Sequence, residues 1–282
     1  GLAEKMVEES KTMKIYISAD IEGVAGVLNW RETELNDPEF GRAAVRMTAE
    51  IASACEAAAG HGAEVLVKDA HDSARNIVPE GLPRGTRLLR GWTGEPESMM
   101  SGLDETYDGV FFIGYHTASG LNGNPLAHTM SHSKIYGMYL NGRLVSEFEW
   151  NAYIAAGLGV PCLLLSGDEE ICRIAGGLLP GIETAAVKAG RGGGVLSLQP
   201  EDACQLIRQA AERALSGIGE KKERCLLSLP ESFLLEIEFK EHYQATKAAH
   251  YPGARSLGPH KVAFESKHYR DILTARMFMM SV

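Results

Sequence analysis

Long apolar runs and an apolar N-terminal segment are both missing from this sequence. No stretch approaches the roughly 18 consecutive apolar residues of a membrane-spanning helix, so none is expected. Residues 1–12 are polar and acidic, whereas a secretory signal would be basic and then apolar. We interpret residues 1–12 as a disordered leader or an expression remnant outside the fold. The cytoplasm is then the simplest location.

Paired cysteines are also lacking. The chain has five cysteines, an odd number, and no CxxC spacing. Cys55 and Cys162 lie inside apolar runs, where a free thiol behaves as a small hydrophobic side chain. We therefore expect free thiols in a reducing compartment, and neither disulfides nor a sulfur-ligated metal.

Positive charge is scarce and scattered. The 37 acidic and 28 basic residues give a net charge of −9, and Lys and Arg form no block anywhere. A nucleic-acid surface or an anionic membrane would require such a block, so neither partner is expected. The hydrophobic content of 45% over 282 residues is enough to fill the core of one large domain or two modest ones.

Apolar runs alternate with helical patterns along the chain. Lys14–Asp20, Glu64–Asp69, Gly109–Tyr115 and Val160–Ser166 have the composition of buried strands. A helical pattern extends from about residue 39 to residue 59. This alternation predicts an α/β fold: a largely parallel sheet covered by helices on both faces.

The second half of the chain predicts a smaller α+β domain. Ile135–Leu140 leads into a tight Asn-Gly turn and a helical stretch over residues 145–156. The Arg-Gly-Gly-Gly segment at 191–194 lacks the ending of a phosphate-binding loop, and we interpret it as a flexible connection. Beyond it we expect helices at about 200–215, 241–250 and from 269, and strands at 233–239 and 261–265. We therefore divide the chain into an α/β metal-binding catalytic domain, residues 13–190, and an α+β domain, residues 191–282.

Histidine and carboxylate side chains follow the predicted strands. The first strand ends in Asp20-Ile21-Glu22, the second is followed by His71, and the third by His116. Because ligands bind at the carboxyl ends of parallel strands, we expect these side chains to share one edge of the sheet. The loops beyond add His128, His132, Glu147 and Glu149.

A mixture of imidazole and carboxylate without thiolate suits zinc, manganese or cobalt. One catalytic zinc usually takes three protein ligands, so five candidates divide more naturally between two ions. These candidates are Asp20, Glu22, His71, His116 and Glu147. Asp20 is the candidate bridge, since Asp20 and Glu22 lie two apart on an extended chain and can point the same way. Each Asp alone could be a helix cap and each His an ordinary hydrogen-bonded residue, and spacing alone does not choose between His128 and His132.

Five motifs occur in a fixed order. They are Ser18-Ala19-Asp20-Ile21-Glu22-Gly23, Asp69-Ala70-His71-Asp72-Ser73, Gly114-Tyr115-His116, Ala127-His128-Thr129-Met130-Ser131, and Glu147 ahead of Asn151-Ala152-Tyr153. With these motifs the sequence, from about Met13 to the C-terminus, resembles the D-aminopeptidase family of binuclear zinc metallopeptidases.

The resemblance implies the roles of the matching residues. The metal ligands would be Asp20, Glu22, His71, His116 and Glu147, with Asp20 shared by two zinc ions, and the catalytic histidine would be His128. It also implies a metal-dependent aminopeptidase acting on short peptides with an N-terminal D-amino acid. The subunit would join a ring-like homo-oligomer, such as a decamer, whose active sites face an internal cavity.

The role of His128 and the reaction class leave alternatives open. His128 would act as a general base and acid or as a nucleophile, and we favour proton transfer because imidazole titrates in the right range. Asp69 and Asp72 would orient the ligand histidines or merely form turns. The rivals to a peptidase are another metal-dependent hydrolase on the same scaffold, an amidase or a phosphoesterase, and an inactive binding protein.

Overall fold

The computed structural model describes residues 12–281. Apart from Thr12, the leader expected over residues 1–12 lies outside the described residues. Within that range, no helix combines the length and the hydropathy that spanning a membrane requires.

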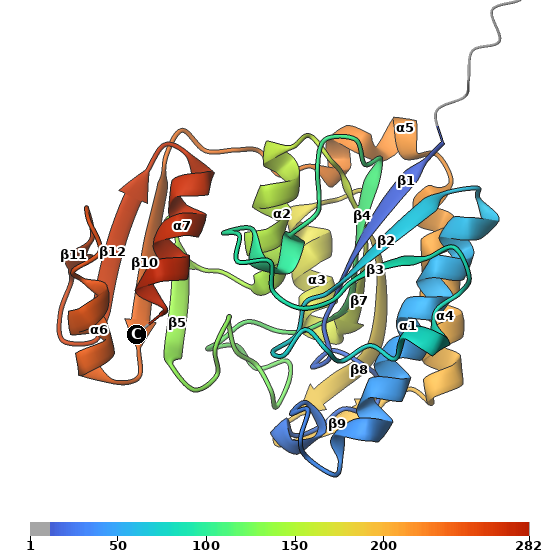
Figure 1. Ribbon diagram of the computed structural model, residues 1–282, viewed down its shortest axis with the longest axis horizontal. Helices are drawn as coiled ribbons and strands as arrows, with labels where there is room; N and C mark the ends of the chain where they lie inside the picture. Colours follow the sequence, from blue (N-terminus) through green and yellow to red (C-terminus); the bar gives the residue numbers. More distant parts are fainter. Residues whose placement is uncertain (1–11, 282) are drawn as a thin grey trace, which may run out of the picture.

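A seven-stranded sheet forms the larger body of the molecule, on the right in Figure 1. Its order is β3-β2-β1-β4-β7-β8-β9, and neighbouring strands are parallel except for the terminal β8–β9 pair. The strands are β1 (Lys14–Ala19), β2 (Glu64–Asp69), β3 (Arg87–Leu89), β4 (Gly109–Tyr115), β7 (Cys162–Asp168), β8 (Glu183–Arg191) and β9 (Gly194–Ser197). The central strands β4 and β7 are buried along their whole length, as covering on both faces requires.

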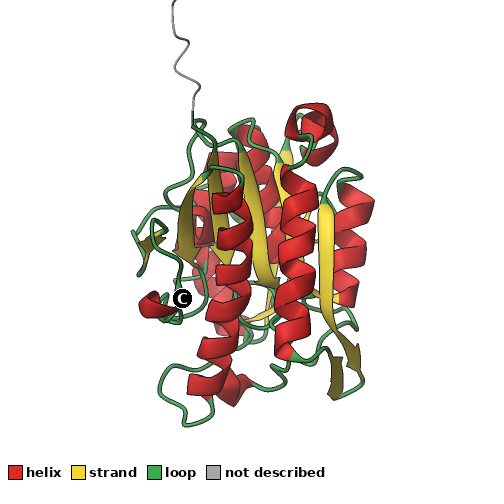
Figure 2. Cartoon of the chain, turned by 90° about the vertical axis from the view of Figure 1, so that its right-hand side faces the viewer, coloured by secondary structure: helices red, strands yellow, loops and turns green. Residues whose placement is uncertain are grey.

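Helices cover both faces of this sheet, which confirms the predicted α/β architecture. The long helices α1 (Phe40–Gly60) and α4 (Pro200–Leu215) pack side by side on one face, where Figure 2 shows them in front of the strands. On the other face lie α2 (Glu147–Gly157) and α3 (Glu169–Leu178). Side chains alternate accordingly along β1: Ile15 and Ile17 face α1, and Tyr16 faces the opposite core.

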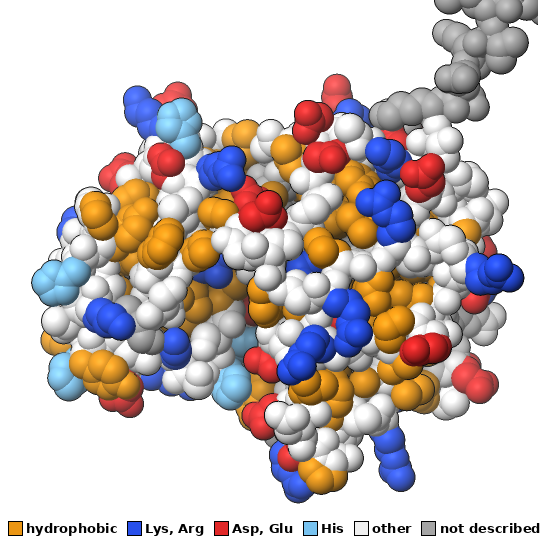
Figure 3. Space-filling view, in the orientation of Figure 1, with side chains coloured by type: hydrophobic (Ala, Val, Ile, Leu, Met, Phe, Trp, Pro, Cys, Tyr) orange, Lys and Arg blue, Asp and Glu red, His pale blue; other side chains and the backbone are white. Residues whose placement is uncertain are grey.

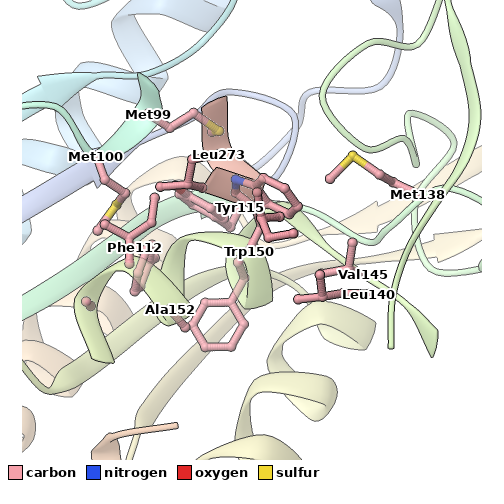
Figure 4. Packing of buried hydrophobic residues seen from close by; sticks show 14 of the residues in the cluster. Met99, Met100, Phe112, Tyr115, Met138, Leu140, Val145, Trp150, Ala152 and Leu273 are labelled. Atoms are coloured by element: carbon pink, nitrogen blue, oxygen red, sulfur yellow. The ribbon is translucent and has the colours of Figure 1, made fainter. Parts of the chain in front are cut away.

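A second, antiparallel sheet lies beside the first, on the left in Figure 1. Its order is β11-β12-β10-β5-β6, formed by β11 (Arg255–Ser256), β12 (Lys261–Ser266), β10 (Phe233–Phe239), β5 (Ile135–Leu140) and β6 (Arg143–Leu144). It packs with α6 (His242–Ala248) and α7 (Tyr269–Met279). One hydrophobic cluster runs from Phe112 in the parallel sheet through Trp150 of α2 to Leu273 of α7 (Figure 4), so the two sheets share a core.

Several elements differ from the expectation. β3, β8 and α3 were not predicted, and the segment at 191–194 is the tight turn that joins β8 to β9. The division of the chain into two domains at residue 190 stays a prediction. The two sheets, however, do not divide at that residue. β9 and α4 belong with the parallel sheet, and β5 and β6 belong with the antiparallel one. The short helix α5 (Ile218–Lys221) follows α4, and all five cysteines are free.

Candidate metal centre

The loop after β1 is held directly against the end of β4. Asp20 N donates to Ile113 O at 2.8 Å, and Gly23 N donates to Gly114 O at 2.8 Å. A Cβ atom on Gly23 would collide with the carbonyl of Tyr115, and one on Gly114, at φ +76°, with the carbonyl of Asp20. Both glycines are therefore required for the two main chains to approach so closely, and this approach brings the loop's carboxylates to the end of β4.

All five predicted ligand side chains lie in one buried cluster. His71 Nδ1 is 3.2 Å from Asp20 Oδ1 and 3.1 Å from Glu22 Oε2. His116 Nε2 is 3.4 Å from Asp20 Oδ2 and 3.4 Å from Glu147 Oε2. The edge of the sheet expected from the sequence therefore gathers these side chains, although they come from four separate segments of the chain.

Backbone carbonyls orient both imidazoles of the cluster. His71 Nε2 lies 2.8 Å from Thr33 O, and His116 Nδ1 lies 2.9 Å from Thr117 O. Since a carbonyl only accepts, each of these nitrogens donates, and the other ring nitrogen faces the carboxylates. Orientation of a ligating histidine by a hydrogen bond on its second nitrogen is common at metal sites.

Three buried atoms of the cluster have no hydrogen-bond partner among the described residues: Asp20 Oδ2, Glu22 Oε2 and His116 Nε2. Buried polar atoms are normally paired, because leaving one unpaired costs about 1–3 kcal/mol. Asp20 Oδ2 and His116 Nε2 lie 3.4 Å apart, and Glu22 Oε2 lies 3.1 Å from His71 Nδ1, so cations held between these ligand atoms would satisfy all three.

The electrostatics of the cluster also require positive charge beside the carboxylates. Burial by itself lowers the pKa of His71, but Glu22 and Asp20 outweigh it and hold that pKa well above its usual range. Burial likewise opposes the charged form of Glu147, yet His116 lowers the pKa of Glu147 to about 2. Glu147 thus stays ionised and needs positive charge beside it, which a proton on His116 or a bound metal ion can supply.

The ligand atoms divide into two overlapping sets. Asp20, Glu22 and His71 form one set and Asp20, His116 and Glu147 the other, and within each set the atoms lie within 4.8 Å of one another. Asp20 belongs to both sets, with Oδ1 toward His71 and Oδ2 toward His116. An all-nitrogen and oxygen donor set of this kind fits two divalent ions that share one carboxylate.

His128 borders the cluster and His132 does not. His128 Nε2 lies 3.5 Å from Glu147 Oε1 and 3.9 Å from Glu22 Oε1, and the His128 ring stacks on His116 at 4.3 Å. His132 stacks on Trp30 instead, at 3.9 Å. With Nδ1 2.9 Å from Leu126 O, the His128 ring turns Nε2 toward the cluster. A third set, Glu22, His116 and His128, also has ligand spacing, so geometry alone allows His128 a ligand role.

A buried carboxylate at the end of β7 was not predicted. It binds two residues that position members of the cluster. Asp168 accepts hydrogen bonds from Thr117 N at 2.7 Å and from Asn124 Nδ2 at 3.1 Å. Thr117 orients His116, and Asn124 Nδ2 also donates to the main-chain oxygen of Glu22 at 2.9 Å. Asp168 also caps α3, so its sequence context alone is that of an ordinary helix cap.

The second role considered for Asp69 and Asp72, turn formation, fits their contacts better than the orientation of histidines. Asp69 accepts from Asn76 N and Ile77 N, which closes the turn after β2, and Asp72 is exposed. The partner of His71 is the main chain of Thr33, which no side-chain pattern could reveal. Glu149 pairs with Arg143 at 2.5 Å, outside the cluster.

Two buried charged residues hold the loop over residues 20–27 from below. Lys188 Nζ donates to Glu22 O at 2.5 Å and to Val27 O at 2.7 Å. Glu50 Oε1 accepts from Ala25 N at 2.8 Å, and its other oxygen is buried without a partner. Burial lowers the pKa of Lys188 to about 8 and raises the pKa of Glu50 to about 7.

We expect Glu50→Gln to gain stability relative to the parent protein as pH rises. Because the folded-state pKa of Glu50 is about 7 against 4.5 when unfolded, folding favours the protonated acid. The parent therefore loses stability between about pH 4.5 and pH 7, by roughly 3 kcal/mol at 1.36 kcal/mol per pKa unit. Glutamine cannot titrate, so the difference in unfolding free energy should grow over this window and then level off. Urea unfolding at pH 5 and pH 8, both with chelator, measures it, and a difference independent of pH would contradict the assignment.

A cavity of about 810 Å³ opens over the cluster. Its wall includes Asp20, Glu22, His71, His128 and Glu147, together with residues of the rim such as Trp30 and Trp92. The volume lies within the range of small-molecule sites. On the face shown in Figure 3, the outline is indented between the two bodies, and basic side chains are interspersed with acidic ones.

Comparison with known proteins gives concordant matches along nearly the whole chain. A model of the D-aminopeptidase family of peptidases matches residues 13–278. A D-aminopeptidase of Bacillus subtilis (strain 168) is 34% identical over 274 residues, which cover 95% of this chain and 96% of the relative. The solved structure of the zinc-dependent D-aminopeptidase DppA from Bacillus subtilis, described as a self-compartmentalizing protease, has a TM-score of 0.87. It is 31% identical and the match covers 95% of this chain and 97% of that one.

Proposed function

Since this chain belongs to the D-aminopeptidase family, we propose that it is a zinc-dependent aminopeptidase that removes the N-terminal residue from short peptides. The preferred N-terminal residue has the D configuration. The observation that carries the proposal is the position of Asp20, which lies between two sets of nitrogen and oxygen ligands in one buried cluster.

The proposed ligands are Asp20, Glu22 and His71 for one ion and Asp20, His116 and Glu147 for the other. When bound, a pair of divalent ions polarises the scissile carbonyl, lowers the pKa of water and stabilises negative charge in the transition state. The protein's own contribution is to hold the ligands in place through Thr33, Thr117 and Asp168, and to supply His128. Nε2 of His128 lies toward Glu147 on the wall of the cavity, where the imidazole can take a proton from water and return it to the departing amine.

Assembly and location extend the proposal. The relative is described as self-compartmentalizing, and we propose that this chain likewise forms a homo-oligomer, with a decameric ring as the specific arrangement. Its proposed location is the cytoplasm. Light scattering of the full chain measures the oligomeric state, and a stable monomer would contradict the ring.

Removal of metal is expected to abolish peptide hydrolysis, and two equivalents of zinc per subunit should restore it. The test is a panel of D- and L-configured dipeptides assayed with the chelator-treated protein and zinc, manganese or cobalt added in turn. A phosphate ester serves as the control substrate. Full activity in the presence of chelator, or hydrolysis of the phosphate ester alone, would overturn the proposed function.

A further inference from the structure

A buried arginine from the C-terminal helix lines the same cavity as the metal-ligand cluster. Arg276 lies in the last turn of α7, and its side chain reaches the cavity wall with only 9% of the residue exposed. Its Nη2 donates to Pro96 O at 3.2 Å. Arg276 lies on a helix that packs with the antiparallel sheet, and the cluster lies at the end of the parallel sheet, but both line the same cavity.

The charge of Arg276 is only partly compensated within the protein. A guanidinium offers five N–H donors, yet Nε is buried without a hydrogen-bond partner, and within residues 12–281 no carboxylate lies within ion-pair distance of it. Beyond ion-pair distance, Glu147 favours the charged form, and the ring of Trp150 lies 6.0 Å from Cζ, so a part of this charge is offset. Burying an unpaired cation is costly, so the arrangement is best suited to a ligand that brings an anion.

The other charged residues that line the cavity indicate where that anion would bind. Glu34 and Asp72 line the exposed part of the cavity and offer an anion no attraction, and Asp37 there is already paired with Arg31. Among the lining residues Arg75 is also cationic, but it is exposed, where water weakens its attraction. Arg276 is the desolvated cation, and a guanidinium fork binds a carboxylate through two parallel hydrogen bonds.

We propose that Arg276 binds the C-terminal carboxylate of the peptide whose amino end lies at the metal-ligand cluster. This inference rests on the proposed aminopeptidase function and adds to it the recognition of the far end of the substrate. A fixed cation also selects length, because each added residue moves the carboxylate by roughly 3.3–3.6 Å in an extended chain. One short peptide length should therefore be preferred over longer ones.

The test compares an unblocked D-alanine peptide with the same peptide ending in an amide, using the zinc-loaded full chain. The parent protein should favour the free carboxylate by roughly tenfold to a hundredfold in kcat/KM, the range for a hydrogen bond between charged groups, mainly through KM. Arg276→Gln should lose this preference, because glutamine carries no charge to attract the carboxylate. Arg276→Lys, which keeps the charge without the fork, should retain part of it. Inhibition by the product that carries the peptide's C-terminal carboxylate, compared with inhibition by the amide of that product, is a second readout. Arg276→Gln should remove this difference as well.

The outcomes separate this inference from the proposed function. A parent protein that hydrolyses neither peptide would refute the aminopeptidase itself. A parent that hydrolyses both without preference, or an Arg276→Lys variant that slows both equally, would show Arg276 to be only a tether to Pro96. Arg75→Gln is the matched control and should keep the preference for the free carboxylate. If Arg75→Gln lost this preference and Arg276→Gln kept it, the inference would also be overturned. Because the parent's own preference needs no variant, the test stands even if Arg276→Gln does not fold.

Discussion

Asp20→Asn is expected to reduce the zinc content from two ions per subunit to one or fewer and to lower kcat/KM by at least about 10³-fold. The carboxylate lies between His71 and His116, with one oxygen toward each, so its loss weakens both proposed ion sites at once. Metal ions supply several kcal/mol of transition-state stabilisation, and each 1.36 kcal/mol corresponds to a tenfold change in rate. Elemental analysis and steady-state kinetics on the same preparation measure the two effects.

The matched control for this variant is Asp72→Asn. Asp72 lines the same cavity one residue after His71, but it is exposed and belongs to neither ligand set. It should keep both ions and most of the activity. If Asp20→Asn retained two zinc ions and near-parental turnover, Asp20 would not bridge a metal pair and the proposed centre would be wrong.

His128→Ala is expected to lower kcat by about 10²- to 10⁴-fold, the usual contribution of a positioned acid–base group, while both ions stay bound. The reason is geometric. Nε2 of His128 approaches Glu147 and Glu22 at 3.5 and 3.9 Å, and neither of the two sets that share Asp20 includes His128. Zinc content and kcat, determined on the same preparation, are the measurements.

His132→Ala provides the comparison, since His132 stacks on Trp30 at the rim and should affect binding more than turnover. Loss of one zinc ion from His128→Ala would assign His128 to the set formed with Glu22 and His116, and the proton-transfer role would then be abandoned. A covalent adduct trapped on His128 would instead favour the nucleophilic alternative.

The parts of the fold that were predictable are those encoded locally. β1, β2 and β4 are apolar runs that end in a carboxylate or lead to a histidine, so both the strand and its chemical ending can be read from a few residues. The side chains at the sheet edge follow because parallel strands end together. The presence of β8 was not predictable in this way, since Ala, Gly and the buried Lys188 interrupt its apolar pattern.

Features that depend on distant segments could not be predicted. β5 pairs with β10, which is almost 100 positions further along the chain, and nothing in either strand specifies its partner. The partners of His71 and His116 are main-chain carbonyls, which every residue possesses. Arg276 carries no motif at all, and only its burial beside the cavity distinguishes it from other helix-terminal arginines.

The contact between Gly23 and Gly114 has a consequence for how far sequences of this kind can diverge. Main-chain atoms of the loop after β1 and of β4 are in direct contact there, so exchanging side chains that do not touch this loop leaves the contact unchanged. Differences at two-thirds of the aligned positions, as between this chain and its relative at 34% identity, are then compatible with an unaltered position of Asp20 and Glu22 at the end of β4. A single methyl group at either glycine would do more damage to the centre than many exchanges around it.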